Sequence, residues 1–351
     1  MDNVLEVRDL TRMAIKEVIP ISVLIEVCHT CNENCIHCYL ADHTRRGMTT
    51  GQYEMLFDQL VDAGTFFVIL TGGEPFMRRD FMEIVRMARR RRISVTIFTN
   101  GTLITEQLAR ELASLWVQEV HISVYGADAS IHDGITRVPG SFKKSMTAVD
   151  LLKKNGITVR FKSPLMSRTA DGISELKALA ESKDVDLQFT AVITAMNDGN
   201  MATTNLRLTD AQLKDLLLDE KIDSHTSQAI ERPSTCDCVP CDTVYNGGAI
   251  DPFGNVFPCN QLQVCGGNVL EQSFGDIWSN SFAFRNLREM RVDGLDDCDG
   301  CSLFLQCTRC PGLALLEDGD IRGCSSAAKR IAKIRRSLGT YPLQNHIFSK
   351  I

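Results

Sequence analysis

The sequence predicts an α/β fold, in which parallel strands alternate with covering helices, followed by a smaller cysteine-rich module. Over about the first two hundred residues, short apolar and β-branched runs alternate six times with longer amphipathic stretches. Successive parallel strands need a crossover connection, usually a helix, so this alternation is typical of a parallel sheet covered by helices. Ten of the fourteen cysteines lie between Cys236 and Cys324, and this concentration marks the second module.

Six strands and six helices are expected before the second module. The strands follow apolar runs and cover residues 22–27, 66–70, 94–98, 119–124, 158–162 and 187–193. The helices cover residues 48–63, 80–92, 106–116, 141–155, 173–182 and 210–219. Thr49 and Thr50 supply hydroxyl groups that favour a helix start at the first of these. The expected division of the chain is a lead-in at 1–20, a first domain at 21–205, a bridging segment at 206–235 and a cysteine-rich domain at 236–351.

The residues with distinctive chemistry follow the predicted strands. The carboxyl ends of parallel strands meet at one edge of the sheet, so the loops that leave them gather there. A cysteine stretch follows the first strand, Gly72-Gly73-Glu74 follows the second, Asn100 follows the third, and Ser123 closes the fourth. One edge of the sheet is therefore expected to collect these residues into a site.

Composition and charge exclude several classes of function. The net charge of −6 gives no reason to expect affinity for nucleic acids. The first residues are partly acidic without a signal-peptide core, and no run approaches about eighteen apolar residues, so a cytoplasmic protein without a membrane span is expected. In such a chain, fourteen cysteines favour metal over disulfides. The basic stretch from Arg86 to Arg92 is interpreted as a solvated helix end.

The first cysteine stretch, residues 28–40, reads CHTCNENCIHCYL. It contains a C-x3-C-x2-C motif formed by Cys31, Cys35 and Cys38. Three thiolates on one loop suit three irons of a four-iron cluster and leave the fourth iron open for a substrate or cofactor. The alternative is zinc, because Cys28 stands three residues before Cys31 and two C-x2-C pairs would complete a tetrahedral sulfur site.

A second motif, TGGEP at residues 71–75, closes the second predicted strand. With the cysteine motif and the strand–helix rhythm over about two hundred residues, it makes the sequence resemble the radical S-adenosylmethionine (SAM) superfamily. The resemblance implies a partial, six-stranded (β/α)6 TIM barrel that is open on one side for a large substrate. It also implies that the amino and carboxylate groups of SAM chelate the open iron, which favours a cluster over zinc and leaves Cys28 as a packed strand-end thiol.

The resemblance assigns several residues near the strand ends to SAM. They are Tyr39, Gly72, Gly73, Glu74, Asn100, Ser123 and Arg137. The two glycines and the glutamate would receive the methionine amino group, at a place where a Cβ would repel a ligand. Ser123 and Arg137 would face the ribose and carboxylate, for which a planar guanidinium is suited. A loop-bridging role is the alternative for Arg137, and Tyr39 would offer its backbone to adenine.

The carboxy-terminal cysteines follow a second family pattern. A C-x12-G-x4-C motif begins at Cys241, and C-x2-C-x5-C with two further cysteines follows. This pattern resembles the SPASM domain, which holds two auxiliary [4Fe-4S] clusters. The resemblance implies a first cluster on Cys241, Cys259 and Cys310, with Cys236 a better fourth ligand than Cys238. It implies a second cluster bound by four other residues: Cys298, Cys301, Cys307 and Cys324.

The chain departs from the SPASM pattern at one point. Two residues, where three are usual, separate Cys307 from Cys310, and a one-residue deletion is expected to turn Cys310 relative to its cluster. Two zinc ions are the alternative to two clusters, since C-x2-C pairs serve both. Full cysteine ligation would leave the auxiliary clusters to electron transfer and substrate positioning. Cys265 is interpreted as structural.

Together the resemblances imply an enzyme with three [4Fe-4S] clusters that cleaves SAM reductively to a 5′-deoxyadenosyl radical. SPASM enzymes mostly modify peptides, so hydrogen abstraction from a ribosomally made peptide is expected, followed by an oxidative change or crosslink. Formylglycine formation is a rival, although Asn260 stands where such maturases carry aspartate. Modification of tRNA is disfavoured by the acidic chain, and an iron–sulfur scaffold without catalysis is the non-enzymatic rival.

The expected partners are a peptide or small protein substrate and an external one-electron donor of the flavodoxin or ferredoxin type. Only about twenty residues precede the first predicted strand, so recognition of a leader peptide is expected to need a separate protein. No nucleic acid and no membrane is expected as a partner.

Overall fold

The computed structural model describes residues 7–44, 47–219, 222, 225–226 and 238–342. The chain divides into two compact units. The barrel unit comprises Ile25–Glu54 and Val68–Ile222, and the cysteine-rich unit comprises Met1–Leu24, Met55–Phe67 and Asp223–Ile351.

The strands of the barrel unit lie side by side in the order of the chain, β1-β2-β3-β4-β5-β6. Their bounds are β1 Ser22–Cys28, β2 Phe67–Gly72, β3 Ser94–Thr99, β4 Glu119–Ser123, β5 Thr158–Pro164 and β6 Asp186–Thr190. The pairs from β3 to β6 are parallel, with Ile122 opposite both Thr99 and Phe161. The expected parallel α/β arrangement of six strands is confirmed.

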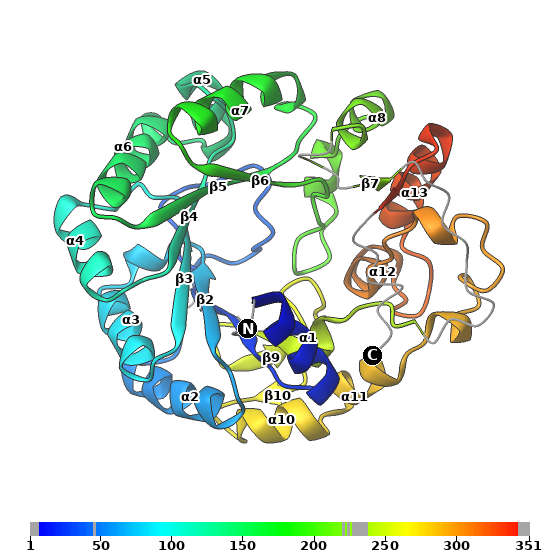
Figure 1. Ribbon diagram of the computed structural model, residues 1–351, viewed down its shortest axis with the longest axis horizontal. Coiled ribbons are helices and arrows are strands. Elements are labelled where there is room, and N and C mark those ends of the chain that lie inside the picture. Colours follow the sequence, from blue (N-terminus) through cyan, green and yellow to red (C-terminus); the bar gives the residue numbers. More distant parts are fainter. Residues whose placement is uncertain (1–6, 45–46, 220–221, 223–224, 227–237, 343–351) are drawn as a thin grey trace, which may run out of the picture. The chain divides into compact units, whose positions relative to one another are not determined.

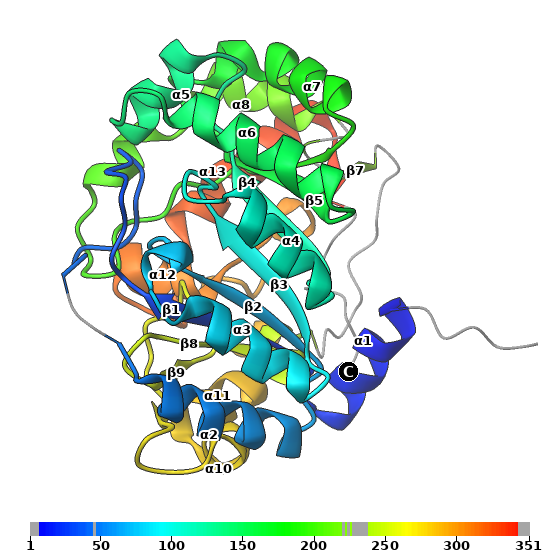
Figure 2. The same ribbon diagram turned by 90° about the vertical axis from the view of Figure 1, so that its left-hand side faces the viewer.

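Helices follow the strands along the chain. They are α2 Thr50–Asp62, α3 Phe81–Arg90, α4 Glu106–Ser114, α5 Ala129–Thr136, α6 Ser141–Lys154, α7 Ile173–Ser182 and α8 Asp210–Leu217. Figures 1 and 2 show α3, α4, α6 and α7 on the outer side of the arc formed by β3 to β6. Helix α5 was not predicted from the sequence; it begins where the Asp128 carboxylate accepts hydrogen bonds from the amides of Ser130 and Ile131.

The strands of the barrel unit have two different faces. In β3 and β5 every second side chain is buried, and α3 and α6 pack against these strands. Successive side chains of a strand point to opposite faces, so the buried residues face the helices. The residues between them are only half-buried and several are polar, which makes the inner face of the arc a candidate binding wall.

The cysteine-rich unit contains short helices and strands. They are α1 Val7–Glu17, β7 His225–Thr226, α9 Thr243–Asn246, β8 Gly247–Ile250, β9 Asn255–Phe257, β10 Gly267–Asn268, α10 Phe274–Asn280, α11 Phe282–Glu289, α12 Pro311–Asp318, α13 Ser326–Leu338 and β11 Tyr341–Pro342. Strands β8, β9 and β10 form an antiparallel meander, and β7 pairs with β11.

Helix α1 lies in the segment that was expected to be a lead-in. The indole of Trp278 donates a 2.8 Å hydrogen bond to the carbonyl of Val18, just beyond that helix. Trp278 is also buried against Phe284, and the guanidinium of Arg288 lies 4.3 Å from the Trp278 ring centroid. Among the described helices of both units, none is long and apolar enough to cross a bilayer.

Candidate functional site

The first cysteine motif occupies the loop that follows β1. Cys31, Cys35 and Cys38, the core cysteines, are all half-buried. Between Cys31 and Cys38, two backbone hydrogen bonds hold the loop to α5. The Asn34 amide donates to the Thr136 carbonyl (3.1 Å), and the Ile36 amide donates to the Ile135 carbonyl (3.0 Å). The carboxyl end of α5 therefore positions the core cysteines.

The core cysteines lie close enough to influence one another electrically. Burial raises the pKa of Cys31 to about 12, and the neighbouring Cys38 adds to the rise. Burial also raises the pKa of Cys35 and Cys38, and for Cys35 the other two thiols contribute. Buried thiols that repel each other as thiolates need a nearby cation in order to ionise, and bound metal supplies it.

Glycines at the end of β2 allow that strand to touch the start of the cysteine loop. A Cβ on Gly72, whose φ is +136°, would lie 2.1 Å from the Cys28 carbonyl oxygen. A Cβ on Gly73 would lie 2.3 Å from the Thr30 carbonyl oxygen. The sequence analysis explained these glycines by the approach of a ligand; the structure gives them a packing reason as well.

Glu74 is completely buried and joins the ends of β2 and β3. Its carboxylate accepts hydrogen bonds from the Thr99 hydroxyl (2.8 Å), the Asn100 amide (2.8 Å) and the Phe76 amide (3.1 Å). Burial raises the pKa of Glu74 to about 7, and the hydrogen bonds oppose that rise. The carboxylate is thus engaged with the protein itself.

Asn100 connects β3 to the cysteine loop. Its side-chain amide donates to the side-chain oxygen Oδ1 of Asn32 over 2.9 Å, and the side-chain amide of Asn32 in turn donates to the Thr102 hydroxyl over 2.8 Å. The structure therefore brings Asn100, Glu74 and the start of the cysteine loop into one hydrogen-bonded network, as the shared strand edge predicted.

Cys28, Tyr39 and Arg137 are placed differently from one another. Cys28 is the last residue of β1, 4% exposed, and its thiol donates to the Glu74 carbonyl over 3.3 Å, so it is the packed strand-end thiol that was expected. The Tyr39 carbonyl accepts a 2.8 Å hydrogen bond from the Asn197 amide. Arg137 ends α5 in the left-handed region (φ 59°), and its exposed guanidinium has no partner among the described residues.

Ser123 and Tyr125 link β4 to the core cysteines. Ser123 is half-buried at the end of β4, and its hydroxyl is among the polar neighbours that influence the pKa of the Tyr125 phenol. The Cys35 side chain packs against the apolar cluster that contains Tyr125. Burial raises the pKa of Tyr125 well above its usual value, so the phenol remains a neutral donor. Tyr125 was not among the residues predicted for the site, although it directly follows the predicted strand 119–124.

Three side chains on the inner face of the strands form what we call the barrel wall: Phe98, His121 and Lys162. The Phe98 and His121 rings stack with centroids 4.8 Å apart, and the Lys162 Nζ lies 3.8 Å from the Phe98 centroid. His121 also contacts the Glu119 carboxylate over 2.7 Å. Lys162 stands opposite Ser123 in the strand register, and its ammonium makes no ion pair with any described residue.

The sequence analysis did not select the barrel wall. Its signal was present, because Glu119, His121 and Ser123 alternate with apolar residues in β4, and Lys162 does so in β5. Burial lowers the pKa of Lys162 to about 8, with a further contribution from nearby Arg160. A half-buried ammonium without a carboxylate partner is a suitable contact for an anionic group of a ligand.

The cysteine-rich unit gathers its thiols into two groups. The first cysteine group consists of Cys241, Cys259 and Cys310. Burial raises the pKa of Cys259 to about 12, and both other members contribute to the rise. Gly312, in the first turn of α12, packs against the backbone of Gln261, which brings Cys310 beside Cys259 despite the shortened spacing.

The proposed fourth ligand of the first group, Cys236, lies outside the described residues. Its alternative, Cys238, is buried and packs with Val292 and Phe304, and Cys298 lies against this apolar group. Cys238 is therefore adjacent to the second set of cysteines. Cys265 is exposed and donates to the Gly267 carbonyl over 3.4 Å.

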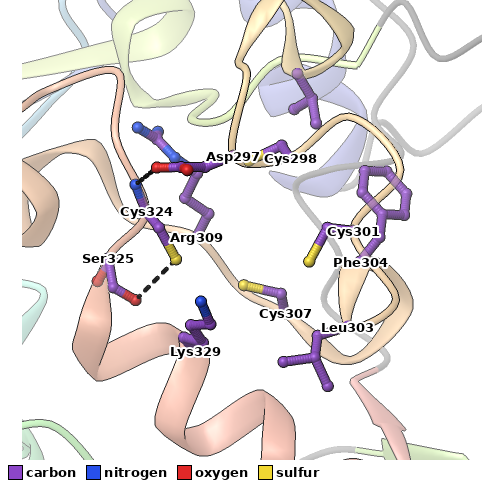
Figure 3. Close-up of a pocket in the computed structure, with 11 residues that line it drawn as sticks. Asp297, Cys298, Cys301, Leu303, Phe304, Cys307, Arg309, Cys324, Ser325 and Lys329 are labelled. Carbon is purple, nitrogen blue, oxygen red and sulfur yellow. Dashed lines mark hydrogen bonds between the residues drawn. The ribbon is translucent and has the colours of Figure 1, made fainter.

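The second cysteine group consists of Cys298, Cys301, Cys307 and Cys324, which line one pocket (Figure 3). Successive backbone hydrogen bonds of 3.2 Å, from Cys301 to Cys298 and from Cys307 to Phe304, coil this segment around the pocket. Burial raises the pKa of Cys307 to about 12, and the other three thiols add to the rise. The four thiols predicted to bind one cluster thus lie around one pocket.

The two kinds of metal site that the thiol groups could form differ in how closely the sulfurs approach one another. In the described parts of the chain, no three His, Cys, Asp or Glu side chains are gathered closely enough to hold one metal ion. Thiolates around one zinc share a single centre about 2.3 Å from each sulfur, whereas a four-iron cluster gives each thiolate its own iron and spreads the ligands. Four thiols that line one pocket, as in the second cysteine group, are compatible with a cluster.

Comparison with known proteins identifies the family. Residues 25–180 match the model of the radical SAM superfamily, and residues 238–311 match the SPASM model, an iron–sulfur cluster-binding domain. Mycofactocin maturase MftC of Mycolicibacterium smegmatis is 30% identical over 305 residues, which span 82% of this chain and 77% of the relative. This chain belongs to the radical SAM superfamily.

Other proteins resemble this radical SAM chain over most of its length. The AdoMet-dependent heme synthase of Methanosarcina barkeri is 26% identical over 328 residues, which span 83% of this chain and 90% of the relative. The solved structure of Streptococcus suis SuiB bound to its precursor peptide SuiA matches with a TM-score of 0.68. That match spans 92% of this chain and 79% of SuiB at 18% identity, and so shows a common fold.

The residues present fit the iron–sulfur clusters that radical SAM and SPASM domains imply. Each unit offers buried thiols whose neighbours are other thiols. The cysteine-rich unit also holds a buried donor without a partner among the described residues, Nη1 of Arg309 at the second group. Atoms of this kind require a partner, and a bound cofactor supplies one.

Proposed function

We propose that this radical SAM enzyme takes a hydrogen atom from a ribosomally synthesised peptide and so installs an oxidative modification or a crosslink. The continuity between the core cysteines and the barrel wall carries the proposal. Cys35 packs against the cluster that contains Tyr125, Tyr125 lies two residues after Ser123, and Ser123 stands opposite Lys162. A substrate lying on the barrel wall would therefore be next to the place where a radical is generated.

The choice of a peptide is supported by the relatives. SuiB was solved with its precursor peptide, and the PqqA peptide cyclase of Granulibacter bethesdensis is 22% identical over 95% of this chain. A separate protein that recognises a leader peptide, and a flavodoxin- or ferredoxin-type electron donor, belong to the same proposal.

The proposal places three [4Fe-4S] clusters on this chain. The core cysteines would hold the cluster that binds SAM, the first cysteine group with Cys236 would hold one auxiliary cluster, and the second group would hold the other. Bound at the core cysteines, SAM and its cluster supply a reductive cleavage that yields a radical able to remove hydrogen from an unactivated carbon.

The residues around the core cysteines would position SAM. Ser123 would face its ribose, and Arg137, with an exposed guanidinium free of described partners, would take its carboxylate. Glu74 already accepts three hydrogen bonds, so its side chain would act by fixing the ends of β2 and β3. The backbone at Gly72 and Gly73 would receive the amino group, and the backbone of Tyr39 the adenine.

Transfer of deuterium tests the reaction. The reconstituted protein is incubated with dithionite, SAM and a deuterated peptide encoded beside its gene, and 5′-deoxyadenosine is analysed by mass spectrometry. Deuterium in 5′-deoxyadenosine together with a modified peptide is expected. Cleavage of SAM without deuterium transfer from any peptide offered would refute the choice of substrate, and absence of cleavage would refute the catalytic proposal.

A tetrapyrrole substrate is the second candidate, because the Methanosarcina barkeri relative is a heme synthase. The same assay with an iron porphyrin distinguishes the two, since haem formation changes the visible absorption spectrum. Formylglycine formation remains a narrower rival. Asn260, whose carbonyl accepts a 2.8 Å hydrogen bond from Gln263, stands where an aspartate would be required for that reaction.

A further inference from the structure

Arg309 occupies an unusual position at the pocket of the second cysteine group. It is only 7% exposed. Its Nε donates to the Gly323 carbonyl over 3.1 Å, and its Nη2 donates to the carbonyls of Gly323 and Ile321. Because these carbonyls lie one and three residues before Cys324, the arginine is fixed to the chain segment that carries that cysteine.

The remaining nitrogen, Nη1, has no hydrogen-bond partner among the described residues although it is buried. Leaving a charged donor buried and unpaired is costly, so its position needs an explanation. Arg309 lines the pocket together with all four thiols (Figure 3). Asp297, the acidic residue of the lining, already accepts a 2.8 Å hydrogen bond from the Cys324 amide.

Thiols are the titratable neighbours of this guanidinium. Burial lowers the pKa of Arg309, and Cys298, Cys307, Cys310 and Cys324 oppose that change. Cys310 belongs to the first cysteine group and the other three to the second. The cation thus lies within electrostatic range of both groups, and Asp297, a described residue of the pocket lining, makes no ion pair with it.

We propose that Nη1 of Arg309 donates an N–H···S hydrogen bond to the iron–sulfur cluster of the second cysteine group and that the guanidinium raises the reduction potential of this cluster. The inference rests on the proposed function, in which these cysteines hold a cluster. One-electron reduction adds a negative charge to the cluster, and a buried cation with a donated hydrogen bond stabilises the reduced form more than the oxidised form.

Two other cations of the same unit provide comparisons. Lys329 lines the pocket but is exposed, so water and salt screen its charge. Arg322 is exposed, does not line the pocket and donates to the Gly294 carbonyl over 2.7 Å. Arg322 is the matched control for removal of an arginine from this unit.

The experiment uses the full chain with the core cysteines replaced by alanine, so that only the auxiliary clusters contribute. Reduction is followed by potentiometric titration with electron paramagnetic resonance, beside iron analysis. R309M is expected to lower the equilibrium constant for one-electron reduction about tenfold, which is about 59 mV. R309K should lower it less, K329M should have a smaller effect than R309M, and R322M should have none.

A second measurement is made on protein that retains Arg309, so the hydrogen bonds of Arg309 to the backbone stay intact. In reduced protein labelled with 15N-arginine, pulsed electron paramagnetic resonance should detect a 15N coupling that disappears in R309K and persists in R322K. Unchanged potential in iron-replete R309M would overturn the inference. If R309M loses iron, its potential cannot be compared, and the 15N coupling in protein that retains Arg309 becomes the test. Absence of that coupling overturns the inference.

Metal analysis separates this inference from the proposed function. If the second cysteine group holds zinc, or if Cys298→Ala with Cys301→Ala removes no iron, the proposed cluster is wrong and the role of Arg309 falls with it. If iron is bound but neither potential nor coupling depends on Arg309, only the inference fails.

Discussion

The amide of Gly73 donates a 2.8 Å hydrogen bond to the carbonyl of Cys28, and this bond joins the end of β2 to the end of β1 immediately before the core cysteines. The Glu74 amide makes the next contact, to the Thr30 carbonyl, at the same distance of 2.8 Å. The cysteine loop is thus seated on the backbone of the glycine motif.

Gly73→Ala is expected to disturb the core cysteines. The added Cβ would lie 2.3 Å from the Thr30 carbonyl oxygen and 2.5 Å from that of His29, and backbone atoms on both sides must move. Such overpacking costs about 1–3 kcal/mol. We expect loss of one cluster's iron and of SAM cleavage, measured by iron analysis and 5′-deoxyadenosine formation.

Gly134→Ala is the control, because nothing lies within 4 Å of a Cβ at that position in α5. It should keep full iron and gain about 0.5–1 kcal/mol in helix stability. Full iron in Gly73→Ala would show that the close contact does not constrain the loop.

Cys310→Ala is expected to remove one auxiliary cluster. Cys310 lies beside Cys241 and Cys259, so the reconstituted variant should hold about eight irons where native protein holds about twelve. Cys265→Ala should retain all of them, since that exposed thiol contacts only the Gly267 carbonyl. If iron in Cys310→Ala equals that of the native protein, the shortened spacing has turned Cys310 away from the cluster.

The second cysteine group should be needed for product but not for SAM cleavage. Cys298→Ala combined with Cys301→Ala leaves the core cysteines intact, so 5′-deoxyadenosine should still form with dithionite while oxidation of the peptide stops. Loss of a metal site also removes folding free energy, so a thermal melt accompanies the assay. A folded variant that completes the peptide modification at the native rate would exclude an electron-accepting role for this group.

Lys162 should make stability depend on pH. Its pKa is lowered to about 8 in the folded protein, so between about pH 8 and its usual value near 10.4 the unfolded chain binds more protons. The free energy of unfolding should therefore rise with pH in that window, by on the order of 1 kcal/mol per unit, and fall as the pH drops towards 8.

Lys162→Met should lack this pH-dependent rise in the free energy of unfolding. The rise is measured at each pH from the difference between the denaturant midpoints of native protein and Lys162→Met. The same variant should weaken transfer of deuterium from substrate if the ammonium contacts it. Lys183→Met, which removes a half-buried lysine paired with Asp150, is the control. A pH-independent difference between native protein and Lys162→Met would mean that Lys162 ionises normally.

Much of the barrel unit could be predicted because its evidence is local. The apolar runs lie within a few residues of the observed strands, and helix α7 spans the predicted 173–182. Helix α5 escaped because its eight residues lack a long amphipathic pattern and its start depends on the cap by Asp128. That omission mattered, since the end of α5 anchors the cysteine loop.

The sequence alone determined the parallel α/β fold and the family and predicted the cysteines that we propose to bind its clusters, because strand periodicity and ligand spacing are recorded in neighbouring residues. Only the tertiary structure decided that Cys310 joins Cys259, that Lys162 lies over Phe98 beside the end of β4, and that Arg309 has a buried donor to spare. The first two are contacts between residues that are distant in the chain, and the third is a buried donor left without a hydrogen bond once the chain has packed. The spacing of neighbouring residues predicts neither kind of feature.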